Sequence, residues 1–236
     1  MGIRAKIASI GLAAAVAMVP VISSPASAAA LPAKVRAVRT LHPGSTGADV
    51  KSLQQQLKSL HYDPGAIDGK YGQNLEYAVW AFQKVNGLTP TGTVGTAFFN
   101  ALAHPRLPKV IYPHGAKYRV EVFLAPKLQY LVVYRAGQIA LISHISSGAG
   151  YPGCKGSGCS ITPTGDYRVI RRIKGPHQSK LGWLWNPLYF YNGYAIHGEP
   201  SVPLYPASHG CVRIPMHTST FFPNLVSNGT PVILRR

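Results

Sequence analysis

The chain has 236 residues, of which 24 are Lys or Arg and only 7 are Asp or Glu, so its formal net charge at pH 7 is +17. This length is ample for two small domains, and a charge this positive favours polyanionic partners. The N-terminal residues 1–28 predict export, so we expect an anionic cell envelope as the partner and no nucleic acid. The alternative is that the charge only aids solubility.

Residues 1–28 have the pattern of a secretory signal peptide. Arg4 and Lys6 precede an apolar run from Ile7 to Ile22, and Ala26-Ser27-Ala28 has the small residues of a cleavage site. The apolar run is shorter than the roughly 20 residues of a transmembrane helix, which favours cleavage over a retained membrane anchor. We therefore expect an exported mature chain that does not span a membrane.

Residues 41–103 are predicted to form a small all-α module of three short helices. Its apolar residues recur at helical spacing in three groups, namely Val50, Leu53, Leu57 and Leu60, then Leu75, Val79, Phe82 and Val85, and last Val94, Phe98 and Leu102. Thr46, followed three residues later by Asp49, indicates a helix start, and glycines such as Gly65 and Gly87 separate the groups.

Two segments without regular patterning flank this module. Residues 29–40 are rich in Ala and carry Lys34, Arg36 and Arg39, which predicts a flexible basic tether. Residues 104–109 contain two prolines and two cations with little to bury, which predicts a semi-rigid linker. We expect the domain boundary at this linker.

Residues 110–236 are predicted to form a mostly β, sandwich-like domain. Val120, Val122 and Leu124 alternate with other residues, and β-forming residues continue on both sides of an Ala136-Gly137 turn. Asn192-Gly193, between two runs rich in aromatic residues, is the strongest hairpin signal in the chain. This hairpin would bring His197 to the end of a strand.

The number of cysteines, three, is odd for an exported protein. Cys154 and Cys159 are separated by a short Gly-rich loop, and a disulfide between them would stabilise the fold by roughly 2 kcal/mol. Cys211 would then be the free thiol. Metal binding by Cys154 and Cys159 is less favoured because no second Cys pair or His doublet completes four ligands, so we expect no metal and no other cofactor.

Cys211 follows two histidines, in Ile196-His197-Gly198 and in Ser208-His209-Gly210. A thiol attacks as thiolate, and a neighbouring imidazole that takes its proton lowers its pKa from about 8.5 toward neutral. The alternative is a cysteine that fills space beside structural histidines. Two His, one Cys and two Gly within one short stretch favour a cysteine nucleophile.

The pairing of an upstream His-Gly with a downstream Ser-His-Gly-Cys-Val-Arg resembles the L,D-transpeptidase catalytic domain of bacterial cell-wall enzymes. The resemblance extends over roughly residues 110–236. It includes Ser146-Ser147-Gly148, Thr162-Pro163-Thr164-Gly165 and the segment from Tyr189 to Gly198. It also implies the β fold that the strand patterning predicts.

The resemblance implies roles for five residues around the thiol. Cys211 would be the nucleophile and His197 the general base that later acts as an acid. The backbone carbonyl of Gly198 would hold the His197 imidazole in the required tautomer. His209 and Gly210 would shape the site, and the N–H groups of Gly210 and Cys211 would form an oxyanion hole.

Three further residues are candidates for binding substrate. Arg213 would stabilise the thiolate and bind a substrate carboxylate, or be only a surface cation. Ser208 would steady the loop through hydrogen bonds. Tyr191 is an aromatic candidate for the wall of a groove that takes a sugar-peptide ligand, or an ordinary member of the hairpin.

Residues 41–103 resemble the peptidoglycan-binding domain that accompanies many wall enzymes. The shared motifs lie at Gly44 to Gln54, at Asp68 to Gly72 and at Ala78 to Gln83. Leu75 and Phe98 stand where that family usually has Thr. The resemblance implies a module that localises the enzyme on the wall, and the alternative is a purely structural three-helix module.

The two resemblances together imply an enzyme of the cell wall or extracellular space. Cys211 would attack the carbonyl of residue three of a peptidoglycan stem, the terminal D-Ala would leave, and an amine of another stem would resolve the thioester into a 3→3 cross-link. With water as acceptor the product is that of an L,D-carboxypeptidase. The alternatives are a wall-binding structural protein and a zinc peptidase, the latter disfavoured by the lack of paired His and Asp ligands.

Overall fold

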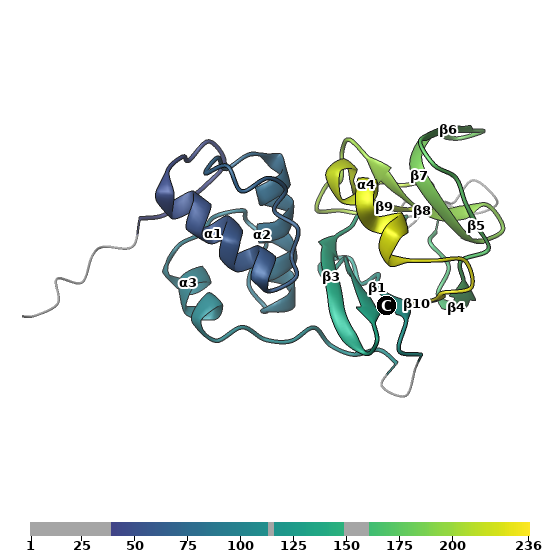
Figure 1. Ribbon diagram of the computed structural model, residues 1–236, viewed down its shortest axis with the longest axis horizontal. Helices are drawn as coiled ribbons and strands as arrows, with labels where there is room; N and C mark the ends of the chain where they lie inside the picture. Colours follow the sequence, from purple (N-terminus) through teal and green to yellow (C-terminus); the bar gives the residue numbers. More distant parts are fainter. Residues whose placement is uncertain (1–38, 113–115, 149–160) are drawn as a thin grey trace, which may run out of the picture. The chain divides into compact units, whose positions relative to one another are not determined.

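The computed structural model describes residues 39–112, 116–148 and 161–236, which belong to one compact unit (Figure 1). The predicted signal peptide, nearly all of the predicted tether, and Cys154 and Cys159 lie outside the described residues. Within the described ranges, no helix is both long enough and apolar enough to cross a membrane.

The predicted three-helix module is confirmed. Its helices are α1 (Ala48–Ser59), α2 (Gln73–Val85) and α3 (Thr96–Ala103). The predicted start of α1 is wrong in detail, because the residue before the helix is Gly47, which has no side chain to cap it. Thr46 instead forms a β-bridge with Lys70.

Buried glutamines hold the two turns between the helices. The Gln54 amide donates to Asp68 Oδ1 at 2.9 Å and its carbonyl accepts the N–H of Gly69 at 2.8 Å. Gln83 does the same for the second turn, where it accepts the N–H of Gly92 at 3.1 Å and donates to the carbonyl of Thr93 at 3.0 Å. These bonds satisfy buried backbone groups that no helix pairs.

The remainder is the mostly β domain that the sequence predicts. Its elements are β1 (Arg119–Phe123), β2 (Tyr130–Arg135), β3 (Gln138–His144), β4 (Gly165–Arg168), β5 (Arg171–Arg172), β6 (Pro176–Ser179), β7 (Gly182–Tyr191), β8 (Tyr194–Glu199), β9 (Val212–Pro215), α4 (Met216–Leu225) and β10 (Pro231–Arg235). One sheet has the order β3-β2-β1-β10-β4, and the other β5-β7-β8-β9 with β6 beside β7. Asn192 and Gly193 form the predicted turn between β7 and β8, both with positive φ.

The two sheets enclose one core, as in a sandwich. Val120 and Leu131 from the first sheet pack with Leu188, Ile196 and Val212 from the second. The helix α4, which the sequence analysis did not predict, closes this core with the fully buried Phe222. The core therefore fixes β8 and β9, the strands that flank the Cys211 motif.

The helical module and the first sheet share a second core. Leu57 and Phe82 of the helices pack with Tyr130, Val132 and Ile142 of the strands. The N–H of Ile142 also donates to the carbonyl of His61 at 2.8 Å. In Figure 1, β3 is the strand that faces the helices.

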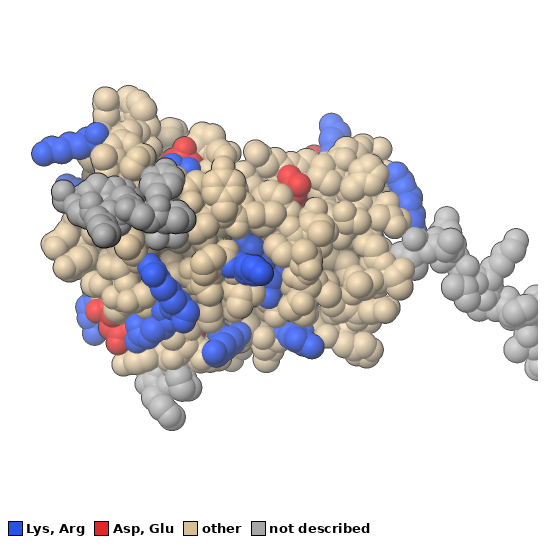
Figure 2. Space-filling model, turned by 180° about the vertical axis from the view of Figure 1, so that it is seen from behind, with Lys and Arg blue, Asp and Glu red and all other residues tan. Residues whose placement is uncertain are grey.

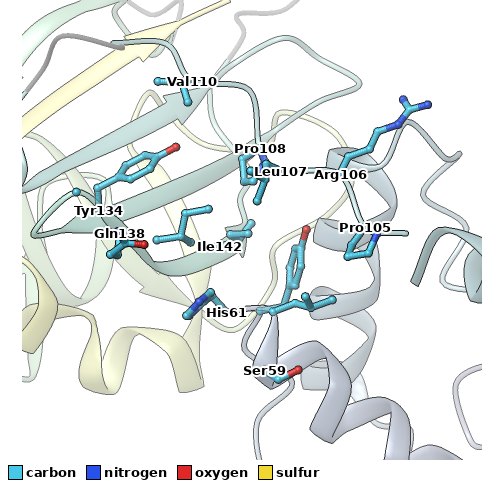
Figure 3. A pocket seen from close by; sticks show the side chains of 14 residues that line it. Ser59, His61, Pro105, Arg106, Leu107, Pro108, Val110, Tyr134, Gln138 and Ile142 are labelled. Carbon is cyan, nitrogen blue, oxygen red and sulfur yellow. The ribbon is translucent and has the colours of Figure 1, made fainter. Parts of the chain in front are cut away.

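A cavity of about 420 Å³ remains at this junction (Figure 3). Its labelled lining comes from the end of α1, from the connecting segment and from the strands, and comprises Ser59, His61, Pro105, Arg106, Leu107, Pro108, Val110, Tyr134, Gln138 and Ile142. The connecting segment is anchored there, since the N–H of Arg106 donates to Asn86 Oδ1 at 2.8 Å. None of the predicted catalytic residues lines this cavity.

Candidate active site

The parallel pair of strands β8 and β9 brings the His197 and Cys211 motifs together. Ile196 lies opposite Val212 and His197 lies opposite Arg213, while Cys211 directly precedes β9. Ile196 and Val212 point into the sandwich core. Because side chains alternate along a strand, His197, Cys211 and Arg213 lie on the opposite face of the sheet. Cys211 is a free cysteine on that face.

His197 is held as a neutral base. Its side chain is 3% exposed, and Nδ1 lies 2.9 Å from the carbonyl oxygen of Gly198. Nδ1 therefore carries the proton, and Nε2 keeps its lone pair. Glu199 Oε2 lies 3.9 Å from Nδ1, too far for a hydrogen bond. Burial, together with the smaller effect of the Arg213 charge, lowers the pKa of His197 from 6.5 to about 4, although the bond to Gly198 acts in the opposite direction.

The thiol does not follow the expectation drawn from the motif. Burial raises the pKa of Cys211, and a hydrogen bond from the backbone of Ala195 and the charge of Arg213 offset only part of this rise. The predicted lowering of its pKa toward neutral is therefore wrong, because a thiolate with little water around it is poorly solvated. The resting pair is a neutral thiol with a neutral imidazole.

Gly198 has a steric role that no sequence pattern indicated. A Cβ at this position would lie 2.6 Å from Cβ of Ser219 on α4 and 3.2 Å from Cβ of Trp185 on β7. Real Cβ atoms do not approach that closely. The glycine thus lets α4 pack directly on β8, at the residue whose carbonyl holds His197.

Ser208 and Gly210 shape the loop before the thiol. The Ser208 hydroxyl donates to the carbonyl of Cys211 and accepts the N–H of Gly210 at 3.0 Å. Gly210 has a φ of 116°, and a Cβ there would overlap the ring of Tyr194. The N–H of Gly210 would have to leave Ser208 before it could join the predicted oxyanion hole.

Thr162 connects the three motifs of the catalytic domain. Its Oγ1 accepts the N–H of Gly148 at 2.8 Å and donates to the carbonyl of Gly210 at 2.8 Å. The carbonyl of Ser147 accepts the N–H of Ser208 at 3.1 Å. These motifs are visible in the sequence, but no role for Thr162 could be predicted from them, because the contacts join residues far apart in the chain.

The remaining predicted residues differ in their surroundings. Arg213 is half-buried, and its charge affects the pKa of both Cys211 and His197. His209 is exposed and lies in the loop. Tyr191 is 40% exposed and stacks on Tyr194 across the hairpin, with ring centroids 6.1 Å apart. The described geometry thus brings Arg213 to the thiol and leaves His209 in solvent.

Two features of the described residues bear on ligands. No group of three or more His, Cys, Asp and Glu residues in the described ranges could hold a metal ion. Figure 2 shows one face of the molecule, on which Lys and Arg are more frequent than Asp and Glu. This distribution agrees with the net charge of the whole sequence and suits an anionic ligand.

Comparison with protein families finds two consecutive matches. Residues 46–102 match the family described as a putative peptidoglycan binding domain. Residues 117–234 match the L,D-transpeptidase catalytic domain.

Comparison with solved structures and curated proteins finds further similarity. The chain is 37% identical to the L,D-transpeptidase (residues 123–326) from Xylanimonas cellulosilytica DSM 15894, with a TM-score of 0.76 over 84% of this chain and 98% of that chain. An L,D-transpeptidase from Stackebrandtia nassauensis is 24% identical, with a TM-score of 0.48 over 83% and 95%. A stretch of 48 residues is 46% identical to the carboxy-terminal processing protease CtpB of Bacillus subtilis (strain 168), covering 20% of this chain and 10% of that protein.

Proposed function

The chain belongs to the L,D-transpeptidase family, with a peptidoglycan-binding domain ahead of the catalytic domain, and we propose that it is an exported enzyme that forms 3→3 cross-links between peptidoglycan stems. Export is supported by the sequence of residues 1–28, and the wall as location by both domains. The net charge of +17 favours an anionic wall.

In the first half of the proposed reaction, Cys211 Sγ attacks the carbonyl carbon of residue three of a donor stem. The thiol proton passes to His197 Nε2, and the tetrahedral intermediate collapses when His197 returns that proton to the amine of the leaving D-Ala. The C–N bond breaks and a thioester to Cys211 remains. Arg213 supplies positive charge next to the sulfur, which stabilises the developing negative charge.

In the second half, an amine of an acceptor stem attacks the thioester carbonyl. His197 Nε2 takes a proton from that amine, the C–S bond breaks, and the proton returns to Cys211. A new amide joins residue three of the donor to the acceptor. With water in place of the amine the same steps release a free carboxylate.

The observation that carries the proposal is the bond between His197 Nδ1 and the carbonyl of Gly198. It directs the lone pair to Nε2 without a carboxylate, on the strand beside a free thiol. Burial keeps this imidazole neutral at neutral pH. Such a base can accept a proton as the thiol attacks, so a preformed thiolate is not needed.

The test uses purified muropeptides that carry tetrapeptide stems. The full chain should convert two monomers into a dimer whose mass is the sum of both less one D-Ala molecule, with one D-Ala released per cross-link. The Cys211→Ala variant should lose this activity by several orders of magnitude while keeping its circular dichroism spectrum. Loss of D-Ala without dimer would indicate a carboxypeptidase, and products that persist in Cys211→Ala would overturn the assignment of the nucleophile.

A further inference from the structure

The helical module contacts the segment that joins the predicted base to the predicted nucleophile. Residues 200–211 run from the end of β8 to the thiol without regular helix or strand. The Tyr77 hydroxyl on α2 accepts the N–H of Val202 at 3.2 Å and donates to the carbonyl of Pro200 at 3.5 Å. A residue of the helices therefore holds the first part of this segment.

Lys84, two turns further along α2, holds the same segment through a histidine. Its Nζ donates to His144 Nδ1 at 2.7 Å, and His144 Nε2 donates to the carbonyl of Val202 at 2.9 Å. Burial lowers the pKa of His144 well below its ordinary value, so the imidazole is neutral and can accept at one nitrogen and donate at the other. Both backbone groups of Val202 are thus bonded, one to Tyr77 and one to His144.

A second route from Lys84 reaches the loop that carries the thiol. Nζ also donates to the backbone carbonyl of Gln129 at 2.8 Å, and the Gln129 side chain accepts the N–H of Ser147 at 2.7 Å. The carbonyl of Ser147 accepts the N–H of Ser208, whose hydroxyl donates to the carbonyl of Cys211. Both ends of the segment are therefore bonded to groups that Lys84 holds.

Burial of the Lys84 amine costs free energy. Lys84 is 3% exposed, and burial lowers its pKa from 10.5 to about 7. An apolar side chain of similar length would avoid the cost of removing an amine from water. The lysine makes two hydrogen bonds into the catalytic domain instead, and the rings of Tyr77 and Trp80 pack on the imidazole that it contacts.

We propose that Tyr77 and Lys84 are positioning residues, through which the helical module holds residues 200–211, and with them Cys211, in place relative to His197. The middle of the segment is held by the catalytic domain itself, because Ser146 Oγ donates to the carbonyl of Tyr205 at 2.7 Å and accepts the N–H of Ala207 at 3.1 Å. The module then has a part in catalysis besides any part in binding the wall. The roles of Cys211 and His197 rest on the proposed function, and the hydrogen bonds that hold the segment do not.

The test compares three single variants of the full chain. Tyr77→Phe keeps the ring and removes only the hydroxyl, and Lys84→Met keeps the length and removes both hydrogen bonds. Gln83→Ala is the matched control, since Gln83 is the buried neighbour of Lys84 on α2 but bonds only to the turn around Gly92. It weakens the module without touching the catalytic segment.

With soluble stem peptides, Tyr77→Phe and Lys84→Met should each lower kcat by about 10-fold with KM within about threefold, because small displacements of a reacting group slow the reaction steeply. The double variant should lose less than the product of the two effects, since both act on one segment. Gln83→Ala should lower the melting temperature and leave kcat unchanged. Equal losses in all three variants, or a kcat of wild type in Tyr77→Phe, would overturn the proposal.

A second readout does not require turnover of stems. The rate at which iodoacetamide alkylates Cys211 follows the ionisation of the thiol, which depends on its burial and on its distance from the backbone of Ala195 and from Arg213. Tyr77→Phe and Lys84→Met should displace the pH midpoint of alkylation from that of wild type, and Gln83→Ala should not. A failure of the proposed function would appear as wild-type protein without cross-linking activity but with this pattern intact, whereas identical midpoints in all four proteins would refute the positioning role.

Discussion

Replacing Thr162 by Val tests whether the hydroxyl that joins the motifs sustains the site. The two side chains have similar shape, but Val leaves the N–H of Gly148 and the carbonyl of Gly210 without a partner. Thr162 is fully buried, so water does not replace the lost bonds. Each unpaired buried group costs about 1–3 kcal/mol, so the two together give a loss of roughly 2–6 kcal/mol in the free energy of unfolding.

The assay is urea unfolding of the full chain, followed by tryptophan fluorescence. With an m-value of roughly 2 kcal/mol/M, Thr162→Val should lower the urea midpoint by about 1–3 M. Its kcat/KM should fall by about 10-fold or more, because Gly210 directly precedes the thiol. Thr162→Ser keeps the hydroxyl and should recover most of both losses. A Thr162→Val midpoint within about 0.3 M of wild type, with unchanged kcat/KM, would refute this reasoning.

Three more predictions concern the thiol and its base. Because burial lowers the pKa of His197 to about 4, the base stays neutral until the pH falls to that value, and the acid limb of kcat/KM should lie near pH 4; a limb near pH 6.5 would contradict a buried neutral imidazole. In the unfolded chain His197 binds a proton below about pH 6.5, whereas in the folded chain it does so only near pH 4. The free energy of unfolding due to this group should therefore decrease as the pH falls from about 6.5 to about 4. If the urea midpoint of His197→Gln depended on pH in the same way as that of wild type, this prediction would be contradicted. A penem-type β-lactam offers a strained amide carbonyl to Cys211, so intact-mass spectrometry should find one adduct on wild type and none on Cys211→Ala.

Local patterns predicted the elements whose cause is local. The apolar spacing of residues 41–103 predicted three helices, and Asn192-Gly193 predicted the hairpin. The helix α4 escaped prediction because its sequence contains Pro223 and few strong helix formers. It is stabilised instead by tertiary packing, through Phe222 in the core and Ser219 on Gly198.

The sequence allowed the site residues to be named, but not their burial or their long-range hydrogen bonds to be predicted. The motifs named His197 and Cys211 as a pair, and the hairpin predicted His197 at the end of a strand, yet neither carried information on burial, which raises the pKa of the thiol. The contact of Tyr77 with Val202 spans 125 residues of sequence, so no local pattern could indicate it. Long-range hydrogen bonds of this kind emerge only from the packed fold.

The shared core changes what a truncation should do. The predicted domain boundary at residues 104–109, with the resemblance of residues 41–103 to a wall-binding module, implied that the helices localise the enzyme and that the β domain could act without them. In the structure, Tyr130, Val132, Tyr134 and Ile142 of the β domain are buried against the helices. Exposing four such side chains costs about 1.5–3 kcal/mol each, roughly 6–12 kcal/mol in all, and a whole domain is stable by only about 5–15 kcal/mol.

We therefore expect a chain of residues 104–236 to be unfolded or aggregated, and to turn over soluble stems at well below the rate of the full chain. Circular dichroism melting and turnover of soluble stems, measured on both chains at the same concentration, check this. Sedimentation with purified sacculi at high salt, which screens the positive charge, then separates wall binding by the module from its support of the fold. A truncated chain that melts cooperatively and turns over stems at the full rate would show that the shared core is dispensable, and would return the helices to a role in localisation alone.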